Sequence, residues 1–194
     1  GFTLDPAEQD SALTAQAVDA AAAADVAVVY MGLPEPEESE GFDRTHLNLP
    51  AKQIELLSRI AAVNPRVVVA LSNGSAVQMN PWQDDAAAVL ETWLLGQAGG
   101  SAVADILFGD ANPSGKLAQS VPLNLTDDPS MLNWPGGDRV VDYGEGVFVG
   151  YRYYDSFGVD VAYPFGFGLS YSTFEISDVE VEVTGAVSAS VSAT

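Results

Sequence analysis

Hydrophobic and polar positions in the first half of the chain follow two patterns, one typical of helices and one typical of buried strands. Residues 6–24 are rich in alanine and predict a helix, with Asp5 as its cap and Pro6 in its first turn. The short apolar run at 26–31 predicts a strand buried on both faces. The chain is therefore expected to start with a helix that leads into a core strand.

The same alternation continues after an acidic loop at 34–48. Residues 50–63 carry apolar side chains at helical spacing behind a proline, which predicts an amphipathic helix. Residues 66–72 predict the next buried strand, and 86–94 a third strand. A glycine-rich turn then opens onto a predicted helix at 101–108. Successive β-α units of this kind predict a parallel sheet covered by helices.

We expect residues 1–172 to form one domain, a three-layer α/β/α sandwich with a mostly parallel, flavodoxin-like sheet. A further short strand is predicted at 116–121. Residues 121–171 are rich in Pro, Gly, Tyr and Phe, and their aromatic content predicts an ordered wrapping segment rather than a disordered one. Residues 174–183 alternate between apolar and polar, so 173–194 are interpreted as the start of a second, all-β domain.

Composition narrows the possible partners. The formal net charge is −20 with only 7 Lys and Arg residues, which disfavours binding to nucleic acid or to anionic membranes. No stretch approaches the roughly 20 apolar residues that span a bilayer. The absence of cysteine excludes disulfides and cysteine-based zinc sites. No signal peptide is visible, and the composition fits a bacterial protein of either the cytoplasm or the secreted class.

The densest group of titratable side chains follows the first predicted strand, where open α/β sheets carry their ligand-binding loops. It comprises Glu35, Glu37, Glu38, Glu40, Asp43, Arg44 and His46. One interpretation is a solvated acidic loop. A second is calcium binding, but the spacing does not match an EF-hand, and we expect neither a metal nor a cofactor. A third is a general acid, because crowded carboxyl groups can raise one another's pKa. Glu40 would then be the acid, and Asp43 and Arg44 a structural pair.

Other candidate sites have weaker support. His46 is the only histidine, and no serine elbow accompanies it, so a Ser-His-Asp triad is unsupported. The glycines at 96–100 lack the spacing of a phosphate loop, and we interpret them as a turn that lets a helix pack closely on the sheet. Among the tryptophans, Trp93 is expected in the core of a strand. Trp134 is the better candidate to stack on a sugar.

The acidic loop contains the stretch Glu38-Ser-Glu-Gly-Phe-Asp-Arg44, followed by Leu47-Asn-Leu-Pro50. This stretch resembles the acid/base segment of glycoside hydrolase family 3 β-glucosidases. Further matches are Gly96-Gln97, Asp105–Asp110, Asn112–Leu117, Tyr143–Asp155 and Tyr163–Phe174, where Phe167 replaces a common histidine. The resemblance covers about residues 20 to 185. It implies the α/β sandwich of a multidomain enzyme whose (β/α)8 barrel carries an Asp nucleophile.

The resemblance also implies roles for single residues. Glu40 would be the acid/base of a retaining β-glycosidase, with Glu38 as the second candidate because two glutamates lie two positions apart. Asp43 and Arg44 would support the loop. Residues 173–194 would begin a fibronectin type III-like domain, and the motif spelling is similar to members with a PA14 insert.

The implied partners are a carbohydrate substrate and the barrel, so the isolated chain is expected to be inactive. Two alternatives remain: a non-catalytic carbohydrate-binding or structural module, and a flavodoxin-like nucleotide binder. The missing phosphate motifs and the negative charge disfavour the second of these.

Overall fold

The computed structural model describes residues 11–137, 139–183 and 187–193. The α/β part contains helices α1 (Ser11–Ala22), α2 (Ala51–Ala61) and α3 (Gly99–Phe108), strands β1 (Ala27–Gly32), β2 (Val67–Ser72) and β3 (Ala88–Glu91), and the 3-10 helix η1 (Trp82–Asp85). The predicted order of helices and strands up to residue 108 is confirmed, with ends that differ by a few residues. The predicted cap at Asp5 and Pro6 lies outside the described residues.

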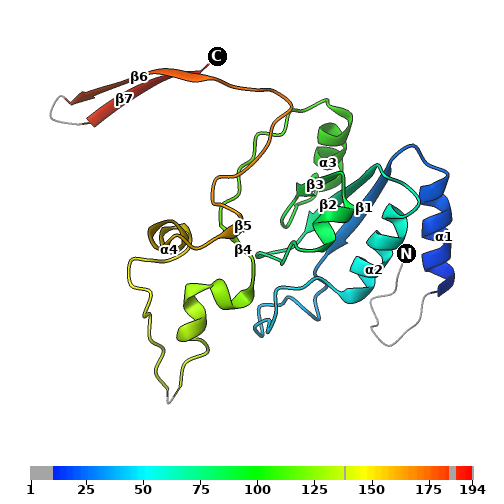
Figure 1. The fold of residues 1–194 in the computed structure, drawn as a ribbon, viewed down its shortest axis with the longest axis horizontal. Helices are drawn as coiled ribbons and strands as arrows, with labels where there is room; N and C mark the ends of the chain where they lie inside the picture. The colour runs from blue at the N-terminus through cyan, green and yellow to red at the C-terminus, as the bar shows by residue number, and fades with distance from the viewer. Residues whose placement is uncertain (1–10, 138, 184–186, 194) are drawn as a thin grey trace.

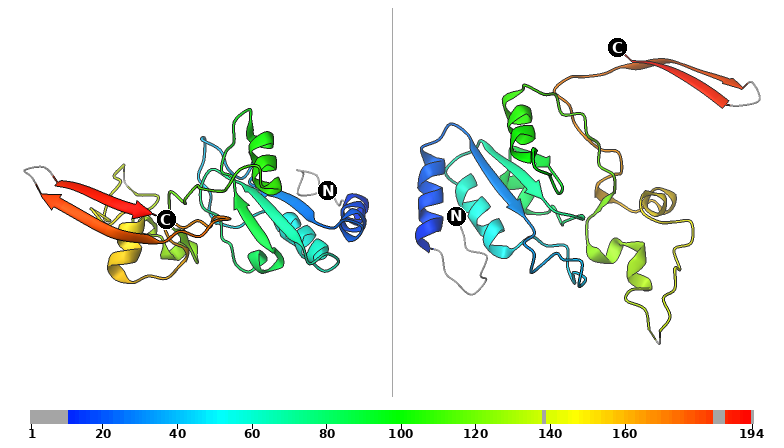
Figure 2. Two further views of the ribbon diagram at one scale, coloured as in Figure 1. Left: turned by 90° about the horizontal axis from the view of Figure 1, so that it is seen from above. Right: turned by 180° about the vertical axis from the view of Figure 1, so that it is seen from behind.

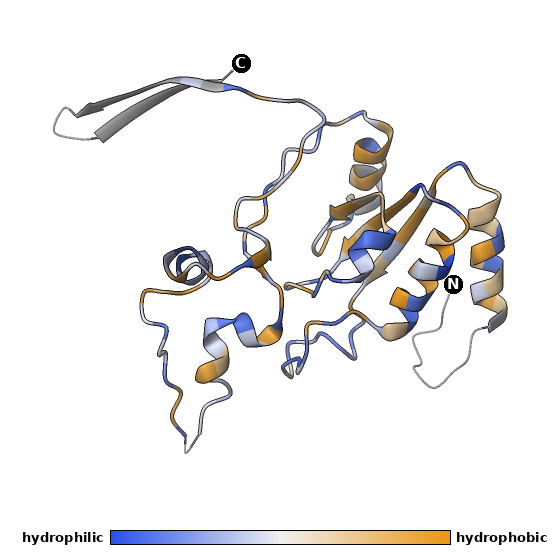
Figure 3. Cartoon of the chain, viewed as in Figure 1, coloured by the Kyte–Doolittle hydropathy of each residue, from blue (hydrophilic) through white to orange (hydrophobic). Residues whose placement is uncertain are grey.

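The three strands form one parallel sheet in the order β1-β2-β3 (Figure 1). Ala27 pairs with Val67, and Val68 pairs with Ala88, so neighbouring strands run in step. The predicted α/β fold with a parallel sheet is therefore confirmed. Figure 3 shows the strands as hydrophobic and the loop after β1 as largely hydrophilic. All three strands end at the same edge of the sheet, where that loop lies.

One face of the sheet holds the core. Helices α1 and α2 pack against each other, and α2 also contacts η1. Leu57 of α2, with Val67 and Val69 of β2, is fully buried, and Trp82 of η1 is 2% exposed. Burial of each such aliphatic side chain stabilises the fold by about 1.5–3 kcal/mol. The amphipathic helix predicted at 50–63 is therefore confirmed as α2, whose apolar side faces the core.

The opposite face is only partly covered. Figure 2 shows α3 on the other side of the sheet from α2, and Val103 of α3 is buried. On β1, however, Val28 is 41% exposed and Tyr30 is 62% exposed. The prediction that residues 26–31 are buried on both faces is thus wrong for this chain. A continuous apolar run does not reveal which elements will cover it, and α1 and α2 both belong to the other face.

The second half of the chain has shorter elements. These are β4 (Val121–Pro122), η2 (Leu125–Asp127), η3 (Pro129–Leu132), α4 (Tyr151–Phe157), β5 (Val161–Tyr163), β6 (Ile176–Val183) and β7 (Val187–Ala193). As predicted, residues 121–171 contain no long element, although α4 was not predicted. The predicted strand near 174–183 is confirmed as β6, which pairs with β7 in an antiparallel hairpin. None of the helices in the described part of the chain is long and apolar enough to cross a bilayer.

The strand predicted at 116–121 is wrong except at its last residue. Val121 belongs to β4, which pairs antiparallel with β5 instead of joining the parallel sheet. Both backbone groups of Leu117 bond to a distant segment. Leu117 N–H donates to the carbonyl of Phe167, and Gly166 N–H donates to the carbonyl of Leu117. Partners from a distant segment therefore determine the conformation here, and the local apolar pattern carries no sign of them.

Candidate functional site

The acidic loop starts at a fixed point at the end of β1. The side-chain amide of Gln53, which is 4% exposed, donates to the carbonyl of Gly32 at 2.8 Å and accepts from its N–H at 2.9 Å. Gly32 also needs to lack a side chain, because a Cβ there would lie 2.1 Å from the carbonyl oxygen of Ser72. α2 and β2 together therefore fix the residue from which the loop departs.

Glu38 attaches this loop to the loop that follows β2. Its Oε2 accepts the N–H of Gly74 at 2.7 Å, and its Oε1 accepts the N–H of Ser75 at 3.1 Å. The Ser75 hydroxyl donates to Oε1 as well, at 3.0 Å. Both carboxylate oxygens are thus engaged in charge-assisted hydrogen bonds. A Cβ on Gly74 would lie 3.2 Å from the Glu38 carboxylate, so the glycine leaves room for this contact.

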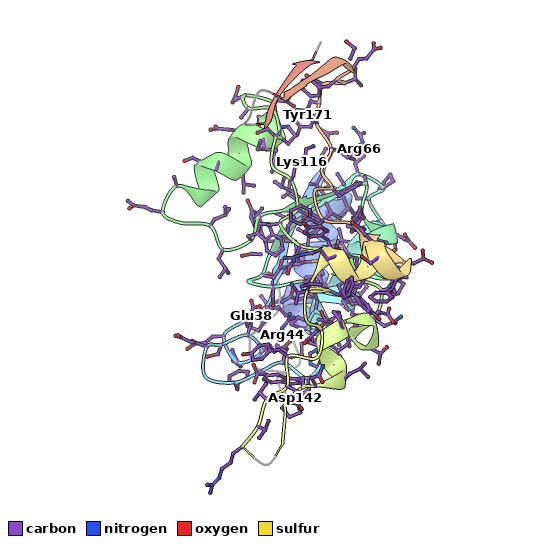
Figure 4. All side chains as sticks on the ribbon, turned by 90° about the vertical axis from the view of Figure 1, so that its left-hand side faces the viewer. Glu38, Arg44, Arg66, Lys116, Asp142 and Tyr171 are labelled. Carbon is purple, nitrogen blue, oxygen red and sulfur yellow. The ribbon has the colours of Figure 1, made fainter. Side chains whose placement is uncertain are left out.

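Arg44 contacts the same loop, and Figure 4 shows it in the same region as Glu38. Its Nη2 donates to the Ser75 hydroxyl at 2.7 Å and to the Ala76 carbonyl at 2.8 Å. Burial lowers the pKa of Arg44, and the negative charges of Glu38 and Glu37 partly offset this effect. These hydrogen bonds join Arg44 to the loop that follows β2, and its role as a support of the acidic loop stays a prediction.

Asp43 and Arg44, both among the described residues, do not form the expected ion pair; Arg59 and Glu55 of α2 do form one, at 3.9 Å. Asp43 is exposed. Adjacent residues in an extended loop point in different directions, so proximity in sequence did not bring these two side chains together. The guanidinium instead satisfies a hydroxyl and a backbone carbonyl.

Glu40 lies at the tip of a short turn between these two anchors. Ser39 and Phe42 form an isolated antiparallel bridge, and the Gly41 N–H lies 3.4 Å from the Ser39 hydroxyl. Glu40 itself is exposed, and no residue in the described ranges forms a hydrogen bond with its carboxyl group. Its carboxyl group is therefore free to meet a ligand or another part of the protein.

Glu91 is a partly buried titratable residue near the acidic loop that the sequence did not single out. It ends β3, at the same edge of the sheet as the acidic loop, and its Oε1 accepts the Trp93 N–H at 2.9 Å. Burial raises the pKa of Glu91 to about 7, although hydrogen bonds from Trp93 and Asn73 act in the opposite direction. The strand predicted at 86–94 placed Glu91 inside the strand, so the sequence did not mark it as an end residue, whereas the structure ends β3 at Glu91.

The three tryptophans have different surroundings. Trp82 is buried in the core, and its indole N–H donates to the Gln78 carbonyl at 2.7 Å. Trp93 was expected inside a strand, but β3 ends at Glu91, and Trp93 adopts a φ of 52° in the following loop. The apolar run at 86–94 does not show where the strand ends, so it could not predict that Trp93 lies in the loop. Trp134 is 48% exposed, as its predicted place on the surface requires.

Two further candidates are not supported as sites. His46 is exposed. Among the described residues, no three His, Asp or Glu side chains are placed to hold a metal ion. The glycine turn at 96–100 has a packing reason: a Cβ on Gly99, the first residue of α3, would lie 2.6 Å from Cβ of Leu95.

Comparison with protein-family models identifies a match over most of the chain. Residues 6–171 match the glycosyl hydrolase family 3 C-terminal domain. The chain belongs to this family. A curated relative is an exo-α-(1→6)-L-arabinopyranosidase of Bifidobacterium longum, 61% identical over all 194 residues of this chain, which cover 26% of that relative. Another is the thermostable β-glucosidase B of Acetivibrio thermocellus, 52% identical over 94% of this chain and 24% of that relative.

Solved structures of family 3 enzymes have the same fold. A β-glucosidase of Bifidobacterium adolescentis superimposes with a TM-score of 0.93 and 60% identity, over 99% of this chain and 28% of that one. A β-glucosidase of Kluyveromyces marxianus does so with a TM-score of 0.84 and 42% identity, over 92% and 21% of the two chains. This family 3 domain thus spans about a quarter of the length of its larger, multidomain glycosidase relatives.

Proposed function

We propose that this chain is the acid/base domain of a retaining glycosidase and that Glu40 is the catalytic acid/base. One observation favours Glu40 over Glu38, the other glutamate of the motif. Both oxygens of Glu38 are engaged by Gly74 and Ser75, whereas Glu40 is exposed and free of hydrogen bonds within the described residues. A proton donor must reach the substrate, and of these two glutamates only Glu40 is exposed for that.

In the proposed reaction, an Asp on a (β/α)8 barrel elsewhere in the protein attacks the anomeric carbon. Glu40 donates its proton to the glycosidic oxygen as the bond to the leaving group breaks. The Glu40 carboxylate then takes a proton from water, whose oxygen attacks the anomeric carbon and releases the Asp. In retaining enzymes the two carboxyl groups lie about 5–5.5 Å apart, so the barrel must dock close to the tip of the 39–42 turn.

The proposal extends to the organisation of the whole protein. The barrel supplies the nucleophile, residues 173–194 begin a fibronectin type III-like domain, and a PA14 domain is inserted in the sandwich. The exposed face of β1 supports the view that other segments cover this domain in the full-length protein. Trp134 is proposed as a substrate contact. The isolated domain would hydrolyse nothing, because it lacks the nucleophile.

The substrate class is a terminal β-linked sugar such as a β-glucoside. A second candidate is a terminal α-L-arabinopyranoside, favoured by the 61% identity to the Bifidobacterium longum enzyme. Hydrolysis rates for the two p-nitrophenyl glycosides, measured on the same preparation of the full-length protein, distinguish these substrates.

The decisive test replaces Glu40 by Ala in the full-length protein. On glycosides with poor leaving groups, kcat should fall by about 10²–10⁴-fold, because general acid catalysis is lost. Activated aryl glycosides should still form the glycosyl-enzyme, and azide should restore turnover by replacing water. Glu35→Ala, which removes another exposed carboxyl group from the same loop, should leave the rates unchanged.

Normal hydrolysis of a disaccharide by Glu40→Ala would exclude Glu40 as the acid/base. Azide rescue of Glu38→Ala instead would assign the role to Glu38. A full-length protein without any barrel nucleophile, which binds sugars but hydrolyses none, would establish the non-catalytic module.

A further inference from the structure

We propose that Glu38 and Ser75 are positioning residues that hold the acid/base turn at a fixed place on the sheet edge. This inference rests on the proposed function of Glu40. The 39–42 turn carries Glu40 at its tip, and the chain on each side of the turn bonds to the same serine. Glu38 precedes the turn and accepts from the N–H and the hydroxyl of Ser75. Arg44 follows it and donates to the same hydroxyl.

The hydrogen-bond pattern requires a carboxylate at position 38. All three groups that face Glu38 are donors: the N–H groups of Gly74 and Ser75 and the Ser75 hydroxyl. A glutamine would turn its NH₂ group toward at least one of these donors, so one hydrogen bond would be lost and one donor pair would repel. The negative charge of Glu38 also faces the partly buried Arg44, which needs a counter-charge.

Ser75 links the two anchors because its hydroxyl acts in both directions. It accepts from Arg44 at 2.7 Å and donates to Glu38 at 3.0 Å. The serine is in turn fixed by β2, since its carbonyl accepts from Asn73 Nδ2 at 2.9 Å. Asn73 is 1% exposed and follows directly on β2. The turn is thereby attached, through Ser75 and Asn73, to the end of strand β2.

Fixing the turn matters because proton transfer depends on geometry. Glu40 has no hydrogen bond of its own within the described residues, so its place is set by the backbone on either side. Its partner, the proposed nucleophile, lies on a different domain. A displacement of about 1 Å in such an arrangement can lower the rate by about 10²-fold. Releasing Glu38 should therefore disturb the proton-transfer steps more than substrate binding.

The test compares Glu38→Gln, Glu38→Asp and Ser75→Ala in the full-length protein. We expect Glu38→Gln and Ser75→Ala to lower kcat on poor leaving groups by about 10–100-fold, with KM changed less than threefold. Glu38→Asp keeps the charge and should retain more activity than Glu38→Gln. Azide should not rescue any of them, because the Glu40 carboxylate is still present. Glu35→Gln removes the charge of an exposed residue of the same loop and serves as the matched control.

Hydrogen exchange gives a second measurement that does not depend on catalysis. The amides of Gly74 and Ser75 should exchange at least tenfold faster in Glu38→Gln than in the wild type. In Glu35→Gln their exchange rates should equal those of the wild type. Unchanged exchange would show that the anchor does not exist. Faster exchange with wild-type kcat would show that it exists but positions nothing. Azide rescue of Glu38→Ala would instead refute the proposed role of Glu40. If Glu38→Gln fails to fold, the kcat of Ser75→Ala still tests whether the hydroxyl link between Glu38 and Arg44 positions the turn.

Discussion

Replacing Gln53 by Met should destabilise the protein at the point where the acidic loop begins. Methionine has nearly the length of glutamine but no polar amide, so the change removes two hydrogen bonds while filling the same space. The Gln53 side chain is 4% exposed and bonds to both the N–H and the carbonyl of Gly32. After the substitution, neither backbone group would have a partner.

The cost follows from these two groups. A buried polar group left without a hydrogen bond costs about 1–3 kcal/mol. Gly32 is only half-buried, so water can reach part of its backbone, and the two groups together should cost about 2–4 kcal/mol. That is a large fraction of the roughly 5–15 kcal/mol that stabilises a typical domain.

Urea unfolding followed by tryptophan fluorescence would measure this loss, because Trp82 is buried in the core beside α2. Gln16→Met is the matched control, since Gln16 is an exposed residue of α1. That control should shift the free energy of unfolding by less than about 0.5 kcal/mol. Hydrogen exchange at the Gly32 amide reports the site directly. A loss below about 0.5 kcal/mol for Gln53→Met, with unchanged protection of that amide, would refute the reasoning.

Two further predictions concern buried polar groups. For Glu91, the pKa is raised from 4.5 to about 7, so its stabilising contribution is complete below about pH 4.5 and is lost as the pH rises to about 7. As the pH rises from 5 to 8, the free energy of unfolding of Glu91→Gln, measured in urea, should increase relative to that of the wild type by about 1–2 kcal/mol; partial exposure of the side chain limits this figure. An unchanged difference across this pH range would contradict the prediction. Asn64, 4% exposed, donates to the carbonyls of Ala21 and Ala24 at 2.9 Å each and accepts from Arg66 N–H at 2.8 Å. Asn64→Ala should cost about 2–4 kcal/mol and speed amide exchange at the end of α1, whereas unchanged exchange there would show that the asparagine does not hold that helix end.

Elements whose character is set locally could be predicted from the sequence. The amphipathic spacing of α2 and the β-branched run of β2 each suit one kind of element, and both are where the pattern indicates. Residues 116–121 show the opposite case. Their backbone groups are taken by Phe167 and Gly166, about fifty positions further along the chain, and no local pattern encodes such partners. The exposure of Tyr30 is of the same kind, because it depends on which elements cover that face.

In the candidate site, too, the features set by local sequence could be predicted and those set by tertiary contacts could not. The acidic loop was predicted from its dense carboxylates and its place after a strand, and Arg44 was predicted to support it. That Arg44 acts through Ser75 rather than Asp43 depends on tertiary contacts. Glu91 was missed because a single carboxylate at the end of a short strand has no distinctive spacing. Its raised pKa comes from burial, which only the folded arrangement of β3 and Trp93 produces.

The contact between Glu38 and the loop at 74–75 nevertheless has a cause in the topology. β1 and β2 are adjacent and parallel, so their carboxyl ends lie about 4.8 Å apart and the two loops that follow must meet. An acidic loop placed there needs donors opposite it, and Asn73-Gly74-Ser75 supplies backbone N–H groups and a hydroxyl without any added positive charge. The chain has a net charge of −20, and the partly buried Arg44 is a cation whose charge interacts with that of Glu38. Removing that cation should therefore weaken the anchor more than removing any single neutral donor does.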